Sequence, residues 1–180
     1  GGDLLERVTV ARERMPEASA AALLLQMLLA VQHVALRGVV HRDIKPENFL
    51  YARRECEREP HPPLKLIDFG LSRILDLTTG ARLTPKIGTT EYMAPEAFTG
   101  RIKPALADRS DVWSLGVVLH VIFMGHFPSP RLADMTTEEY LSMPCWRRVS
   151  AQGKAFLGQM IRYEPERRPA VTAALKHPWL

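Results

Sequence analysis

The stretch HRDIKPEN, from His41 to Asn48, decides how this chain of 180 residues folds. Two shorter blocks follow it, DFG at Asp68–Gly70 and APE at Ala94–Glu96. One such block arises often by chance, but three blocks in a fixed order and at matching intervals do not. A lone aspartate or asparagine in a turn usually caps the backbone. Here the joint match predicts one site, whose side-chain oxygens are suited to Mg²⁺.

In this order the blocks form the signature set of protein kinases, and the sequence resembles the C-terminal, catalytic lobe of a eukaryotic-type protein kinase. The resemblance runs from Gly1 to Leu180. It implies an α+β, protein-kinase-like fold, with a mainly α-helical C-terminal lobe and one or two short β-hairpins. It also implies that residues 1–180 are a partial kinase domain, from the hinge-proximal segment through the final helix, with the N-terminal lobe absent.

The resemblance implies phosphoryl transfer, with ATP and Mg²⁺ as cofactors and Ser or Thr hydroxyls of proteins as acceptors. Asp43 would orient the acceptor and take its proton, and Lys45 would stabilise the transferred phosphate. A lysine at this position is typical of serine/threonine kinases. Asn48 and Asp68 would be the metal ligands, and Asp43, Lys45 and Asn48 the catalytic set. The candidate cofactor-binding residues are Lys45, Glu47, Asn48, Leu50 and Asp68.

Other matched residues are expected to hold the site together. His41 and Phe69 resemble two members of the family's hydrophobic stack. Asp111 resembles the helix residue that hydrogen-bonds the catalytic-loop backbone. Glu96 and Arg168 resemble a buried ion pair. The candidate structural residues are His41, Arg42, Phe69, Gly70, Glu96, Asp111 and Arg168.

Residues 71–93 lie between DFG and APE, where the family carries its activation segment. Thr89 is expected to bridge Asp43 and Lys45. Arg42 is the matched residue that would capture a phosphorylated threonine of this segment. Thr84 is the first candidate acceptor. Thr78 and Thr79 are further candidates, and solvent-facing loop threonines are the alternative for all three.

Two acidic residues are candidates for substrate recognition. Asp3 and Glu47 lie where related kinases hold basic substrate side chains. Carboxylates there favour arginine upstream of the acceptor, through charge-assisted bidentate pairing. Leu50 and Leu4 resemble the apolar floor under the adenine ring, and ordinary core leucines are an equal alternative.

Four stretches resemble the calcium/calmodulin-dependent and calcium-dependent protein kinases: Gly1–Val8, Glu47–Leu50, Lys86–Thr89 and His177–Leu180. The sequence departs from that branch at His126–Ser129 and at Glu91, on the substrate-facing side. No calcium-binding loop of the form DxDxDG occurs. Regulation by a calcium sensor is therefore expected only through parts outside these residues.

Composition excludes several other classes of function. The net charge is +4, but the basic residues are scattered among acidic ones, so no nucleic-acid partner is expected. The longest apolar stretches, Ala20–Val31 and Val112–Met124, are shorter than the roughly 20 residues of a membrane span. Cys56 and Cys145 lack metal or redox spacing, which favours a reducing, intracellular compartment, the cytoplasm.

Hydrophobic patterning predicts helices at 17–37, 110–125, 151–163 and 171–176, and strands at 39–40, 49–51 and 64–67. Ser110 and Asp111 are expected to cap their helix, and Gly38 to end the first one. A Thr-Thr-Glu-Glu run at 136–139 predicts a further helix start. Residues 71–93 are expected to be irregular.

No glycine-rich GxGxxG loop occurs in the chain. Three explanations are open for a sequence that has the kinase C-lobe blocks without this loop. A piece of a working serine/threonine kinase is favoured, because Asp43, Asn48 and Asp68 are all intact. The alternative is a catalytically inactive, truncated lobe that serves as a protein-binding or regulatory module. A third explanation, another class of phosphotransferase, disagrees with the pairing of Glu96 and Arg168.

Overall fold

The computed structural model describes Leu4 and residues 15–52, 63–75, 87–100, 102–129 and 135–180. Its helices are α2 (Glu17–Ala35), α3 (Pro95–Thr99), α4 (Asp108–Met124), α5 (Thr137–Ser142), α6 (Ala151–Met160) and α7 (Val171–Ala174). Short 3-10 helices are η1 (Pro46–Asn48), η3 (Thr90–Tyr92), η4 (Pro104–Leu106), η6 (Pro144–Arg148) and η7 (Pro165–Arg167). The strands are β1 (Val39–Val40), β2 (Phe49–Tyr51), β3 (Leu64–Leu66) and β4 (Arg73–Ile74). The expected α+β fold, mainly helical with short strands, is confirmed.

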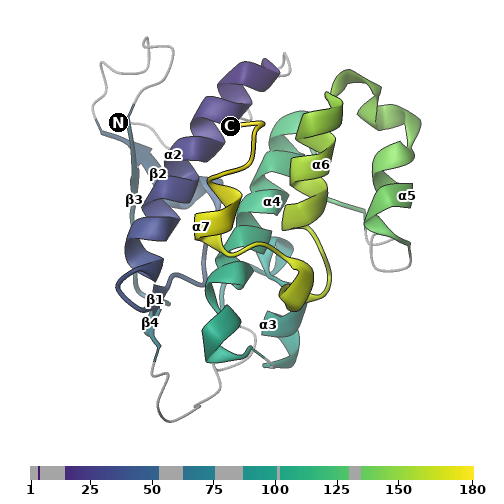
Figure 1. The fold of residues 1–180 in the computed structure, drawn as a ribbon. Coiled ribbons are helices and arrows are strands. Elements are labelled where there is room, and N and C mark those ends of the chain that lie inside the picture. The colour runs from purple at the N-terminus through teal and green to yellow at the C-terminus, as the bar shows by residue number, and fades with distance from the viewer. Residues whose placement is uncertain (1–3, 5–14, 53–62, 76–86, 101, 130–134) are drawn as a thin grey trace.

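Helix α4 is the centre of the hydrophobic core. It contacts α2 on one side and α6 on the other, and α7 contacts both α2 and α4 (Figure 1). Almost every side chain from Ser110 to Met124 is buried, so this helix is covered on all sides rather than along one stripe. Its position makes α4 the support on which the loops of the candidate site rest.

Helix α2 is long and apolar enough to cross a membrane by length and composition alone. The expectation that every apolar stretch is too short for a span is therefore wrong for this helix. Leu24, Met27 and Leu28 are fully buried in the described structure. The helix packs against α4, α7 and β3, so its apolar character is accounted for by the core.

The four strands form two separate antiparallel pairs, β1 with β4 and β2 with β3. Val40 pairs with Arg73, and Phe49 pairs with Leu66. Residues 41–48 therefore begin directly after one strand pair and end directly before the other. Residues 67–72 run between the same two pairs. The strands thus fix both ends of the two loops that carry the HRDIKPEN and DFG blocks.

Several expected helix ends differ from the structure, among them those of α6 and α7, which end at Met160 and Ala174 rather than at 163 and 176. Helix α4 begins at Asp108, so Ser110 and Asp111 lie inside its first turn and do not cap it. Helix α2 ends at Ala35, and Gly38, with φ +70°, lies in the following turn. The start of α5 is as expected, because Thr136 and Glu139 form a capping box.

Candidate active site

The loop 41–48 is attached to the core by one buried carboxylate. The Asp111 oxygens accept hydrogen bonds from the backbone N–H of His41 at 2.8 Å and of Arg42 at 2.9 Å. Asp111 is 1% exposed, and this burial raises its pKa to about 6 despite the two donors. Arg42 has a φ of +71°, a conformation that a non-glycine residue adopts only when its surroundings hold it there.

His41 links this loop to the DFG block. Its Nε2 donates to the carbonyl of Ile67 at 3.0 Å, because a carbonyl can only accept. Its Nδ1 therefore accepts from the backbone N–H of Asp43, at 3.3 Å. The His41 ring also meets the Phe69 ring edge-on, with centroids 5.0 Å apart. The expected pair of stacked residues thus lies in contact and joins the two loops.

Asp43 is the centre of a hydrogen-bonded cluster. Its Oδ1 accepts from the N–H of Thr89 at 2.8 Å and from the Thr89 hydroxyl at 2.7 Å. Its Oδ2 lies 3.0 Å from the Lys45 ammonium and 3.2 Å from the Asn48 amide nitrogen. Burial alone would raise the pKa of Asp43, but the bonds from Thr89 and Lys45 outweigh it and lower the pKa. Asp43 is therefore a buried carboxylate at neutral pH.

Lys45 connects the catalytic loop to the segment before APE. Its ammonium donates to the Thr89 hydroxyl at 2.8 Å while it pairs with Asp43. Thr89 thus contacts both residues, which is the bridging position expected for it. The Lys45 side chain is 22% exposed, so its charge is fixed at the edge of the site and still reaches solvent.

Asn48 and Asp68 provide oxygen donors that fit Mg²⁺. The Asn48 amide nitrogen donates to the Asp43 carbonyl at 2.7 Å, which leaves the Asn48 side-chain oxygen without a donor in the described part of the chain. The backbone N–H of Ile67 donates to the Asn48 carbonyl at 2.9 Å, so Asp68 follows close beside Asn48. Asp68 is exposed and accepts from the N–H of Gly70 at 3.1 Å.

These donors suit a hard cation that keeps other ligands. The described residues hold no group of three or more His, Cys, Asp or Glu side chains placed for a metal. Mg²⁺ is usually bound by one or two protein oxygens together with water and phosphate oxygens. Asn48 and Asp68 fit that requirement, whereas a metal that needs a full cage of protein ligands does not.

Gly88 packs directly against the catalytic loop. Its φ is +119°, and a Cβ at this position would lie 2.3 Å from the Arg42 carbonyl oxygen. The same Cβ would lie 3.7 Å from Asp43 Oδ1. Only glycine fits here without a backbone shift. The sequence predicted the bridging role of Thr89 but not this contact of Gly88, whose only signal was the glycine itself, next to Thr89.

Glu96 and Arg168 form a buried pair behind the site. Arg168 Nη1 lies 2.7 Å from Glu96 Oε1, and Nη2 lies 3.2 Å from Oε2. Arg168 also donates to the carbonyls of Arg109 at 2.7 Å and Arg162 at 2.9 Å. Ser110, first interpreted as a cap, donates to Glu96 at 3.0 Å. This network connects α3 and α4 to the loop before α7.

The remaining candidates are placed less centrally. Leu50 is partly exposed on the face of β2 opposite the buried Phe49 and Tyr51, whereas Leu4 is fully buried in the core. Glu47 Oε2 is buried and meets no hydrogen-bond donor in the described ranges. Burial raises the pKa of the Tyr92 hydroxyl, and the nearby charges of Glu47 and Glu91 raise it further. Asp3, Thr78, Thr79 and Thr84 lie outside the described residues.

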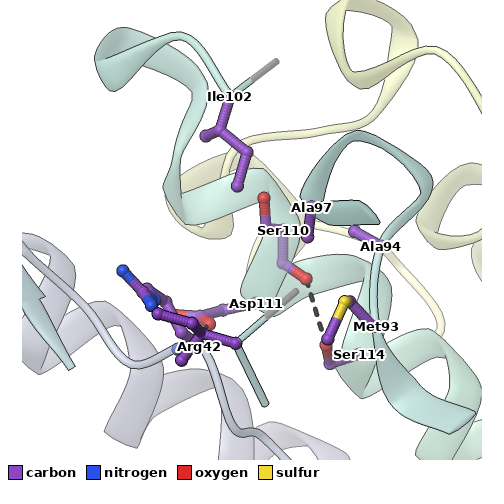
Figure 2. A pocket seen from close by; sticks show the side chains of 9 residues that line it. Arg42, Met93, Ala94, Ala97, Ile102, Ser110, Asp111 and Ser114 are labelled. Carbon is purple, nitrogen blue, oxygen red and sulfur yellow. Dashed lines mark hydrogen bonds between the residues drawn. The ribbon is translucent and has the colours of Figure 1, made fainter. Parts of the chain in front are cut away.

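A small pocket lies between Arg42 and the start of α4. Figure 2 shows Arg42 and Asp111 on one side of it and Ala94, Ala97 and Ser110 on the other. Burial, with the nearby charge of Arg73, lowers the pKa of the Arg42 guanidinium. The pocket therefore combines the Arg42 cation and the Asp111 carboxyl group with largely apolar walls, directly behind the loop 41–48.

Comparison with known proteins gives a consistent set of matches. The sequence profile of the family described as "Protein kinase domain" matches residues 1–180. Calcium/calmodulin-dependent protein kinase type I of Schizosaccharomyces pombe is 35% identical over the whole chain, which covers 53% of that relative. CDPK-related kinase 3 of Arabidopsis thaliana is 34% identical, and calcium-dependent protein kinase 9 of Oryza sativa is 36% identical. The chain spans 30% and 31% of those two relatives.

Proposed function

Because this chain belongs to the protein kinase domain family, we propose that its protein is a serine/threonine protein kinase. It transfers the γ-phosphate of Mg·ATP to Ser or Thr hydroxyls of protein substrates. Family membership confirms the resemblance drawn from the three sequence blocks. The observation that carries the proposal is the cluster in which Asp43 accepts hydrogen bonds from Thr89, Lys45 and Asn48.

Asp43 is the proposed base. Both of its oxygens already accept two hydrogen bonds, so an acceptor hydroxyl needs one of these positions. Lys45 is the partner that can leave, because its ammonium is drawn toward the charge of a transferred phosphate. Asp43 Oδ2 then receives the hydroxyl proton, while Thr89 keeps Oδ1 in place.

Mg·ATP, when bound, supplies the phosphoryl group, and the metal neutralises its oxygens. Asn48 and Asp68 would hold the metal through their side-chain oxygens. Asn48 is oriented for this by the hydrogen bonds that its amide nitrogen makes to Asp43. Leu50, partly exposed on β2, would offer apolar surface to the base of the nucleotide.

Glu47 supports a preference for basic substrates. It is a partly exposed carboxylate of the loop 41–48, so a guanidinium or ammonium of a substrate could pair with it. We propose arginine upstream of the acceptor as the preferred side chain, and the cytoplasm as the setting. The names of the relatives include calcium and calmodulin, and regulation of that kind would act through regions outside these residues.

The test is Asp43→Asn in the full-length protein. Transfer of radiolabelled phosphate to an arginine-containing serine peptide should fall by about 10²–10⁴-fold, the usual contribution of a positioned base. The thermal midpoint should stay close to that of the wild type, because asparagine fills the same space. Glu164→Gln also replaces a carboxylate by an amide, but at an exposed position, and it should retain activity.

Full turnover in the Asp43→Asn variant would refute the assignment of the base. Absence of phosphate transfer in both the wild type and the Asp43→Asn variant would favour the alternative, a binding or regulatory module. The exposed side chains of Phe69, within the DFG block, and of Leu71 and Ile74, after it, are the surface that such a module would offer a partner.

A further inference from the structure

Two arginines precede a serine where η6 ends and α6 begins. Arg147 and Arg148 close η6 and are exposed, and Ser150 is the exposed N-cap residue of α6. Val149, which lies between Arg148 and Ser150, has φ −95° and ψ 134°. Ser150 has φ −59° and ψ 160°. The serine hydroxyl therefore lies on an extended piece of backbone, two and three positions after exposed guanidinium groups.

We propose that Ser150 is a phosphoacceptor for an arginine-directed serine kinase, and that its phosphorylation breaks the contact between Glu17, Ser150 and Trp179. In the transfer, the Ser150 Oγ–P bond forms and the bond from the γ-phosphorus to the departing ADP oxygen breaks. The hydroxyl proton passes to the base carboxylate of the kinase. Where that kinase is a second copy of this protein, the inference rests on the proposed function.

Glu17 holds three groups from distant parts of the chain. Its Oε2 accepts from the backbone N–H of Ser150 at 3.0 Å. Its Oε1 accepts from the Ser150 hydroxyl at 2.5 Å and from the Trp179 indole N–H at 2.6 Å. The start of α2, the start of α6 and the end of the described chain thus meet at one carboxylate.

The contact between these three residues is tightly packed and charged. A Cβ on Gly153 would lie 2.5 Å from Glu17 Oε1 and 3.0 Å from Trp179 Nε1. Burial opposes the charged form of Glu17, but the bonds from Ser150 and Trp179 lower its pKa overall. Glu17 is therefore an anion at neutral pH, and little space remains for a larger group beside it.

Phosphorylation acts in opposite directions on α6 and on Glu17. It adds about −1.5 to −2 charges and removes the hydroxyl donor, so it repels the Glu17 carboxylate. Negative charge at a helix N-terminus is favourable, and Ser150 Oγ already accepts from the N–H of Gly153 at 3.0 Å. Helix α6 should keep its cap, while Glu17 and Trp179 separate from it.

The experiment uses full-length protein in two arms, with occupancy of Ser150 read by phosphopeptide mass spectrometry. In one arm, active protein receives only Mg·ATP. In the other, the Asp43→Asn variant is incubated with Mg·ATP and a separate arginine-directed serine kinase. We expect phosphate on Ser150 in at least one arm. The paired change Arg147→Ala and Arg148→Ala should slow it about tenfold or more, because charge-assisted bonds are lost.

Arg167→Ala, an exposed arginine on η7, is the matched control and should leave the rate unchanged. No phosphate on Ser150 in either arm, while a free peptide of residues 143–154 is labelled, would overturn the proposal. Equal labelling without Arg147 and Arg148 would also overturn it. If Ser150 is labelled only in the second arm, a separate kinase is the enzyme that phosphorylates it. Labelling of an external peptide by the active protein then shows whether the proposed kinase function itself has failed.

The consequence is tested by thermal unfolding of the domain with and without phosphate on Ser150. Phosphorylation should lower the midpoint by about 2–4 °C in the wild type. In a Glu17→Ala background the fall should be smaller, because the carboxylate that is repelled is already absent. An equal fall in both backgrounds, or none in the wild type, would contradict the role given to Glu17.

Discussion

Gly88 shows how one residue without a side chain can control the position of the carboxylate that we propose as the base. The residue that follows it, Thr89, gives both of its donors to Asp43. Gly88 itself lies so close to the Arg42 carbonyl that no Cβ fits between them. The close approach of these two backbones therefore brings Thr89 within hydrogen-bond distance of Asp43.

Gly88→Ala is expected to separate the two segments. A Cβ at 2.3 Å from Arg42 must push the backbone back, and a displacement of about 1 Å at a reactive site can cost about 10²-fold in rate. Peptide phosphorylation by the full-length variant should fall to that extent. Gly38→Ala is the control, because Gly38 also has a positive φ but has open space around it. Equal activity losses in the two variants would show that backbone strain, not the contact, is responsible.

Residue identity predicted the chemistry of the site better than its geometry. The type and order of Asp43, Asn48 and Asp68 were enough to predict an oxygen-donor site. The tertiary contacts of Gly88 could not be inferred, because a glycine leaves no polar or apolar pattern. Ser110 was interpreted as a local cap, whereas its hydroxyl bonds to Glu96 in α3.

At the scale of elements, α4 gathers the separate loops of the site. Asp111 holds the backbone of the catalytic loop, and Ser114 donates to the Tyr92 carbonyl at 2.8 Å. Ser110 holds Glu96, on the first turn of α3. These three polar residues lie within the first two turns of the helix, and their side chains are buried. One rigid helix thus sets the relative positions of the catalytic loop, η3 and α3.

Elements with a local signal in the sequence were predicted, whereas β4, which has no such signal, was not. Helix α5 has its own capping box, which is visible in the sequence. Strand β4 has two exposed residues, Arg73 and Ile74, and exists because it pairs with β1. No local pattern in residues 71–75 reveals that partner, so this stretch was expected to be irregular.

The ion pair between α3 and the loop before α7 should be important for stability. Arg168→Leu leaves the Glu96 carboxylate buried without its partner, and we expect a loss of about 3–5 kcal/mol in the free energy of unfolding. Changing both residues to leucine should cost less than the sum of the single changes, as a double-mutant cycle in urea would measure.

The exposed pair of Lys103 and Glu166 is the control for this prediction. Its ammonium and carboxylate lie 2.8 Å apart, with side chains 69% and 54% exposed. Solvent screening should leave this pair with a much smaller coupling energy than the buried pair. Equal coupling energies for the two pairs would contradict the importance given to burial.

At the scale of the whole molecule, two buried groups oppose each other as the pH changes. His120 is fully buried and donates from Nδ1 to the His126 carbonyl at 2.9 Å, so its Nε2 accepts from the Tyr140 hydroxyl. Burial lowers the pKa of His120 to about 4 and raises the pKa of Asp111 to about 6. The two groups are on the same helix, and acid affects them with opposite sign.

The sign follows from which state holds the proton more tightly. Neutral His120 stabilises the fold above pH 6.5, its pKa when unfolded, and this contribution is lost as the pH falls toward 4. Protonated Asp111 stabilises the fold below pH 3.8, its pKa when unfolded, and this contribution is lost as the pH rises through 6. Between roughly pH 4 and 6, the opposite effects of the two groups on the free energy of unfolding should largely cancel.

The His120→Gln variant should show the pH dependence of stability that Asp111 contributes, without the opposing contribution of His120. Glutamine does not titrate, so the free energy of unfolding of the variant, relative to the wild type, should improve by on the order of 3 kcal/mol between pH 7 and 4. Urea unfolding at each pH gives this difference, and other carboxylates such as Asp43 and Glu17 cancel from it. His33→Gln, at an exposed position of α2, is the control for replacing a histidine by glutamine. A constant difference between His120→Gln and wild type would mean that His120 gains its proton equally easily in the folded and unfolded chain, and that its burial does not set the acid response of the molecule.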